Sequence, residues 1–256
     1  MEVAGIEVLF ALAGAGLIAG AVNAIAGGGT FFSFPVLIWA GLPPLVANTT
    51  NMVALLPANG TALPPMRAQL RKLGRQVIVP LVAGVIGGTS GAILLLWLGD
   101  AVFASAVPYL IGFATLLFAT APTLRQKLAS VTSGSEGPSP VWTAILVLGF
   151  SVYGGYFGAG IGQILLAAMI LCGFQDLREA NALKNLVSFG ISVVAVVVFA
   201  GSGNVHWLYA LVMMVSSAVG GYLGGTLSVV APQKLLRRGI ITFGCCLTAY
   251  YMIFGA

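Results

Sequence analysis

The stretch NAIAGGGTFFSFPVLIWAGLPPLVANTTN, residues 23–51, places three consecutive glycines between two apolar segments. The preceding apolar segment, residues 6–26, is long enough to cross a bilayer. The following one, residues 30–40, covers only about half of a ~30 Å hydrocarbon core. Consecutive glycines interrupt a helix, and the backbone groups they free are tolerated at membrane depth only when they are buried in protein or face a wet cavity. This stretch therefore predicts a membrane protein with broken helices.

The composition of the whole chain agrees with this prediction. Of 256 residues, 59% are apolar and only 7% are charged, so the chain cannot cover a water-facing surface as a soluble domain does. The same figures exclude a disordered chain and a secreted disulfide scaffold. The basic residues are scattered over loops, which argues against nucleic acid as a partner. We expect an all-α polytopic membrane protein surrounded by a lipid bilayer.

The sequence contains few residues that could form a metal site or an enzyme active site. His206 is the only histidine, and it has no second ligand or nucleophile near it in the sequence. Cys172, Cys245 and Cys246 lie within apolar runs without Cys-x-x-Cys spacing, and we expect them to act as small hydrophobic residues. We therefore expect no catalytic residues, no metal and no cofactor.

A second stretch, GGYFGAGIGQILLAAMILCGFQDLREANALKN at residues 154–185, repeats the pattern of the first. A shift of 133 positions places Gly27 on Gly160 and Asn48 on Asn181, and the same shift aligns glycines further along both halves. One fixed offset that holds over about 65 residues indicates an internal duplication.

Each half contains five apolar segments in the order long, short, long, long, long. The first half has them at residues 6–26, 30–40, 45–63, 77–98 and 101–121, and the second at 141–157, 162–172, 177–200, 206–230 and 234–255. We predict a first transmembrane repeat at 1–125, a cytoplasmic Gly/Ser/Pro-rich linker at 126–140 and a second repeat at 141–256. The short segments are either re-entrant or spanning, and the sequence leaves both alternatives open.

Basic residues orient these repeats. Arg67, Arg71, Lys72 and Arg75 crowd the connection before residue 77, which predicts that this connection is cytoplasmic. The equivalent connection in the second half, residues 201–204, carries no charge and is predicted on the other side. The two repeats then have inverted topology, and both termini are extracytoplasmic.

The glycine-rich junctions between the long and short segments form one part of a candidate binding site. Their freed backbone groups would face a cavity, although plain interhelical turns are the alternative. A nucleotide-binding loop is excluded, because neither junction follows a strand or ends in Gly-Lys-Ser/Thr.

The second part lies at the start of the segments at 45–63 and 177–200. Lys184 falls within an apolar helix, where a lysine is costly unless it faces a cavity, a partner or an anionic ligand; snorkelling to the interface is the alternative. We expect the N-termini of both segments to approach the midplane and to form an anion site with Lys184. The candidate binding residues are Gly28, Gly29, Thr30, Asn48, Thr49, Asn51, Gly160, Gly162, Gln163, Asn181, Lys184 and Asn185.

Three charged residues precede or begin the segment at 177–200. Asp176, Arg178 and Glu179 are candidates for gating or coupling, because the two carboxylates are the only acidic residues near the proposed site. A solvated loop is the alternative.

These motifs resemble a known family. N-A-I-A-G-G-G-T-F-F-S-F-P-V-L, G-L-P-P and A-N-T-T-N, all between Gly20 and Asn51, resemble the opening repeat of the TauE/SafE sulfite exporter family, also called the 4-toluene sulfonate uptake permease family. G-A-G-I-G-Q and A-N-A-L-K-N resemble its second signature. The chain has Asn48-Thr49-Thr50 where the family usually has Gly-Thr-Ser, and Ala182-Leu183 where it often has Thr-Ser. The loss of hydroxyl groups in the second repeat would suit a different or bulkier anion than sulfite.

The resemblance implies an inner-membrane transporter of small sulfur-containing anions such as sulfite or organosulfonates. We expect a secondary transporter, an exporter that works by alternating access. The alternatives are an anion channel or uncoupled facilitator, and a non-transporting subunit that docks partners through its basic residues. A homodimer is compatible with the glycine-rich helix faces, which pack helices within a chain as readily as between chains.

Overall fold

The computed structural model describes residues 5–132, 139–174, 176–227 and 233–255, with side chains for all of these except 121–132 and 233–237. The described residues form helices and no strands. The helices are α1 (Ile6–Ala26), α2 (Thr30–Trp39), α3 (Pro44–Thr61), α4 (Arg67–Leu73), α5 (Ile78–Thr132), α6 (Pro140–Tyr156), α7 (Ile161–Leu171), α8 (Leu177–Ala200), α9 (Trp207–Leu227) and α10 (Gln233–Phe254), with 3-10 turns at Pro64–Met66 and Gly74–Val77.

Each apolar segment expected from the sequence contains a helix, and residues 228–230 of the expected segment 206–230 lie outside the described residues. The bounds of α1 and α8 match the expected ones. The segments at 77–98 and 101–121 are two arms of α5, separated by Gly99, whose φ of 76° is not helical. Within the described residues, four stretches are long and apolar enough to cross a membrane: α1, α8, α9 and a continuous stretch, Pro64–Thr120, that includes both arms of α5. The fold is thus that of an all-α polytopic membrane protein.

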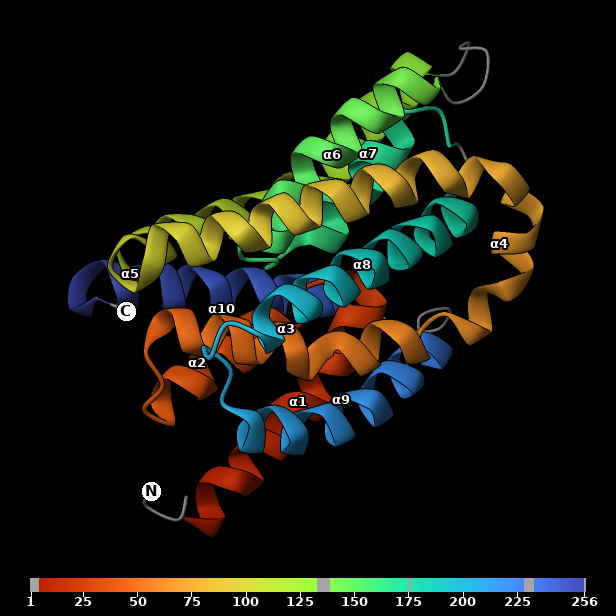
Figure 1. The fold of residues 1–256 in the computed structure, drawn as a ribbon. Coiled ribbons are helices and arrows are strands. Elements are labelled where there is room, and N and C mark those ends of the chain that lie inside the picture. The colour runs from red at the N-terminus through yellow and green to blue at the C-terminus, as the bar shows by residue number, and fades with distance from the viewer. Residues whose placement is uncertain (1–4, 133–138, 175, 228–232, 256) are drawn as a thin grey trace.

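Most of the helices run along a common direction, and the two ends of the bundle differ (Figure 1). The N- and C-terminal ends lie at the same end as the turn between the arms of α5 (yellow) and the connection from α8 to α9. Helix α4 lies across the opposite end, roughly perpendicular to α3 and α5.

Close backbone contacts at glycines hold the long helices together. A methyl group at Gly220 or Gly224 of α9 would overlap the carbonyl oxygens of Leu17 and Ala21 on α1. A methyl group at Gly87 or Gly91 of α5 would likewise overlap the carbonyl oxygens of Leu148 and Val152 on α6. Gly220 and Gly224 are the positions 133 residues after Gly87 and Gly91, so equivalent glycines make equivalent contacts. These glycine faces are occupied within the chain.

Two segments expected to be connections contain helix. Helix α5 continues to Thr132, into the expected 126–140 linker, because residues 124–129 are good helix formers and the helix-breaking residues come later. The basic connection before α5 forms α4, whose Leu73 is buried and whose Leu70 packs beside it on a core cluster. Helix α4 was not predicted from the sequence, because two leucines in seven residues give a weak periodic signal. Residues 133–138 of the expected linker lie outside the described residues.

Candidate functional site

A cavity lies where both glycine junctions meet α3 and α8. Its volume is about 40 Å³, which is room for about three water molecules. Polar side chains that line it are Asn23, Thr30, Asn51, Asn59, Lys184, Asn185, Ser188 and Ser192. The rest of the lining is glycine and apolar: Gly27, Met52, Leu55, Gly154, Phe157, Gly158, Ile161, Gly162 and Ile191.

The two glycine junctions cross each other in van der Waals contact. Gly27 ends α1 with a φ of 76°, in the left-handed region that favours glycine. A Cβ at Gly162 would lie 2.6 Å from the Cα of Gly27, so neither position has room for a side chain. Gln163 Nε2 donates to the carbonyl oxygen of Ala26 at 2.5 Å and joins the junctions. Helices α2 and α7 therefore begin at the cavity, and their positive N-terminal ends face it.

Lys184 brings the charge of the site. Its side chain is only 2% exposed, and its Nζ lies 3.5 Å from the point that a Cβ of Gly162 would occupy. The side chain therefore points at the crossing of the junctions instead of snorkelling to the interface. A positive charge in a buried, water-poor position attracts an anion more strongly than it would in water, so this position is suited to an anion.

The polar residues of α3 and α8 form one stripe on each helix. Asn51 and Asn59 on α3, and Lys184, Ser188 and Ser192 on α8, recur at intervals of four or eight, so they share a helix face. Asn59 Nδ2 donates to Ser192 Oγ at 2.7 Å, and these two residues are 133 positions apart. The stripes of α3 and α8 thus meet at equivalent positions.

Other hydrogen bonds extend this polar lining, and two of its atoms have no partner. Asn23 Nδ2 donates to Asn59 Oδ1 at 2.6 Å, and Asn51 Nδ2 donates to Thr30 Oγ1 at 3.2 Å. Asn51 Oδ1 and Ser188 Oγ are buried without a hydrogen-bond partner in the described part of the chain. Such a group costs about 1–3 kcal/mol, so both are suited to interact with a ligand or water in the cavity.

The structure brings together five of the residues expected at the site: Thr30, Asn51, Gly162, Lys184 and Asn185 line the cavity. The other seven do not line it. Asn48 Nδ2 donates to Tyr156 O at 3.0 Å, Thr49 Oγ1 donates to Asn204 O, and Gln163 donates to Ala26 O. Gly28 and Gly29 pack against Phe118 and Ala19, Gly160 packs against Phe118 and Ala114, and Asn181 lies partly exposed on α8. These residues support the cavity from outside, except for Asn181, for which no contact suggests a role.

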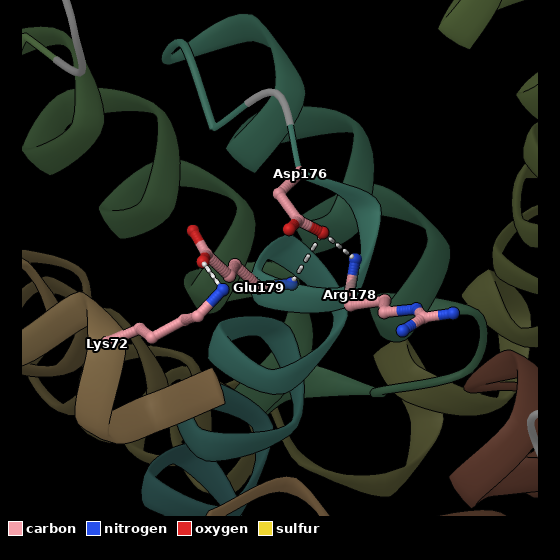
Figure 2. A network of polar contacts seen from close by, with 4 residues as sticks. All are labelled: Lys72, Asp176, Arg178 and Glu179. Carbon is pink, nitrogen blue, oxygen red and sulfur yellow. Dashed lines mark hydrogen bonds and ion pairs between the residues drawn. The ribbon is translucent and has the colours of Figure 1, made fainter. Parts of the chain in front are cut away.

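The charged residues at the start of α8 do not line the cavity. Figure 2 shows the contacts that they make instead. Asp176 caps the helix by accepting hydrogen bonds from the backbone N–H groups of Arg178, at 2.8 Å, and Glu179, at 3.4 Å. Glu179 pairs with Lys72 of α4 at 3.6 Å, and the guanidinium of Arg178 points away from Asp176.

This geometry corrects the expected position of the helix N-termini. The N-terminus of α8 is capped by Asp176, and the backbone N–H of Leu45 in the first turn of α3 donates to Asp100 at 2.8 Å. Neither terminus reaches the cavity. A helix that spans the whole bundle must start at one end of the bundle. Only the short helices α2 and α7 can therefore begin in the interior of the bundle.

Four polar residues of the cavity were not predicted from the sequence: Asn23, Asn59, Ser188 and Ser192. For the last three, the signal that could have found them is a polar residue repeated every four or eight positions on an otherwise apolar helix. In the described part of the chain, no cluster of three or more His, Cys, Asp or Glu side chains could hold a metal.

The cavity and its helices define a membrane protein with an internal polar site. Residues 12–251 match the sequence model of the family described as "Sulfite exporter TauE/SafE". The chain therefore belongs to the TauE/SafE family and is a membrane transporter, which agrees with the expectation that it is not an enzyme.

Curated relatives are described as probable membrane transporters. A "probable membrane transporter protein" of Haemophilus influenzae is 32% identical over 96% of this chain and 94% of its own length. A "probable membrane transporter protein" of Sinorhizobium, ORF9, is 30% identical over 87% and 84% of the two chains. Escherichia coli YfcA, also a "probable membrane transporter protein", is 29% identical over 91% and 85%. No solved structure matches the chain.

Proposed function

We propose that this transporter exports small sulfur-containing anions, sulfite or small organosulfonates, through the cavity at the crossed glycine junctions. The observation that carries the proposal is the position of Lys184, a buried ammonium beside the N-terminal ends of two short helices. Positive charge and backbone donors in a water-poor site favour an oxyanion. A cavity with room for about three water molecules can hold a sulfite ion, which has one sulfur and three oxygen atoms. A longer organosulfonate requires the cavity to widen.

The transport mechanism we propose is alternating access between two inverted repeats. Equivalent glycine contacts on both sides and the Asn59–Ser192 pair support a two-fold relation between residues 1–125 and 141–256. In such transporters the two halves rock around a fixed central site.

Contacts at the two ends of the bundle are suited to act as gates for this motion. At one end, the backbone N–H of His206 donates to Thr50 Oγ1 at 2.9 Å and holds the connection before α9 against α3. At the other end, Glu179 pairs with Lys72, and Asn185 Nδ2 contacts Met66 Sδ at 3.1 Å. We assign Glu179 to gating on this basis. Lys72 is 71% exposed and Glu179 is 24% exposed, so the pair remains in contact with solvent and is worth only about 0–1 kcal/mol. This end therefore opens at little cost.

Transport can be measured with the purified protein in liposomes. We expect saturable uptake of radiolabelled sulfite, and accelerated uptake when unlabelled sulfite is trapped inside. Such counterflow requires a carrier, because a channel gives neither saturation nor exchange. Uptake equal to that of protein-free liposomes would contradict the proposed function and would favour the non-transporting subunit.

We further propose that the protein lies in the inner membrane with both termini extracytoplasmic. The basic helix α4 and the two ends of the chain lie at opposite ends of the bundle, which supports this orientation together with the positive-inside rule. In a variant without native cysteines, we expect a cysteine at Ser202 to react with an impermeant thiol reagent in intact cells. A cysteine at the exposed Ala68 of α4 should react only after lysis. Labelling of both from the same side would contradict the inverted repeats.

A further inference from the structure

Helix α4 and the 3-10 turn that follows it carry a row of basic side chains, of which only Lys72 takes part in the proposed gate. Arg67, Arg71, Lys72 and Arg75, here called the basic face, are all exposed, whereas Met66 and Leu73 on the other side are buried. No aspartate or glutamate occurs in residues 64–78. The helix therefore combines an anchored apolar side with an uncompensated positive side.

The charge of the basic face is mostly unpaired within the described residues. Lys72 contacts Glu179, but its side chain is 71% exposed. The three arginines form no ion pair with any described carboxylate. Exposed charges of this kind attract anions from outside the protein, and arginine binds phosphate oxygens through two parallel hydrogen bonds.

The start of α5 shows where the lipid lies. Ile78, Val82 and Ile86 follow the basic face, recur every four residues and are each more than half exposed. Exposed isoleucine and valine on one side of a membrane-spanning helix face lipid tails. This stripe begins three residues after Arg75, so the basic face lies at the depth of the lipid headgroups.

We propose that the basic face binds the phosphate groups of anionic phospholipids in the adjoining leaflet. Charge complementarity and headgroup depth favour lipid over a soluble partner. A bound lipid phosphate would compete with Glu179 for Lys72, so it would also act on the contact between α4 and α8. This proposal concerns a surface separate from the transport cavity and does not depend on the transported anion.

The test uses the purified full-length protein in neutral detergent. We expect phosphatidylglycerol to raise the unfolding temperature and to remain bound in native mass spectrometry, whereas phosphatidylcholine does neither. The triple variant Arg67→Gln, Arg71→Gln, Arg75→Gln should lose affinity for phosphatidylglycerol on the order of 100-fold. Arg238→Gln removes an exposed arginine outside the basic face and is the matched control.

The proposal would be overturned by an equal effect of phosphatidylcholine, by full phosphatidylglycerol binding of the triple variant, or by an equal loss in Arg238→Gln. An equal stabilisation by inorganic phosphate would also overturn it, because the site would then take free phosphate. If the triple variant does not fold, the proposal is tested by measuring how phosphatidylglycerol binding to the wild-type protein depends on ionic strength. Loss of phosphatidylglycerol binding at high ionic strength supports the proposal, and salt-independent binding contradicts it.

Discussion

Gly27→Ala is expected to lower the unfolding temperature by roughly 10 °C and to abolish transport. Alanine at a φ of 76° adopts a left-handed conformation that costs about 1–2 kcal/mol. Its Cβ would also lie 2.5 Å from the Cα of Gly162. That neighbour is backbone and cannot rotate away, so overpacking adds about 1–3 kcal/mol. The measurement is thermal unfolding of the detergent-solubilised protein, followed by size-exclusion chromatography.

Gly14→Ala is the matched control. Gly14 also lies on α1, but nothing lies within 4 Å of a Cβ built there and its φ is helical. Alanine should leave stability unchanged or raise it by up to about 1 kcal/mol, because alanine favours helix. If Gly27→Ala were as stable as Gly14→Ala, the contact between the junctions would not be what holds α1 against α7.

The junctions were predictable from the sequence because a glycine cluster between two apolar segments is compatible with few structures in a membrane. The same holds for helix ends: α1 stops at the first glycine of its cluster, and α8 begins directly after Asp176, its N-cap. Lys184 could be singled out because so few charges fall within apolar helices. In each case a single residue type carries a strong local preference.

The composition of the cavity could be predicted only in part. The position of a side chain around a helix follows from spacing, but which face meets which neighbour is decided by tertiary packing. Asn48 and Asn51 lie on the same turn of α3, yet Asn51 lines the cavity and Asn48 donates to a backbone carbonyl of α6. Asn59 can be recognised as a site residue only from its hydrogen bond to Ser192, which joins the two halves of the chain.

Lys184→Met is expected to lower sulfite transport by at least roughly 30-fold while the protein stays folded. Removing one partner of a buried charge interaction costs about 2–5 kcal/mol of ligand binding. Methionine keeps most of the length of lysine, so the packing around this 2%-exposed side chain is retained. The substitution also removes the cost of holding an ammonium group away from water. The unfolding temperature without substrate should therefore equal or exceed that of the wild-type protein.

Two measurements on the same protein separate a binding role of Lys184 from a structural one. Sulfite should stabilise the wild-type protein against thermal unfolding, because a ligand that binds the folded state raises its stability. Lys184→Met should lose this stabilisation, and Lys184→Arg should keep part of it, since the positive charge remains but a larger planar group enters a cavity of about 40 Å³. If Lys184→Met is well folded and still moves sulfite at the wild-type rate, the anion does not pass beside Lys184. A lower unfolding temperature with unchanged stabilisation by sulfite would instead assign the ammonium group a structural role at the junctions.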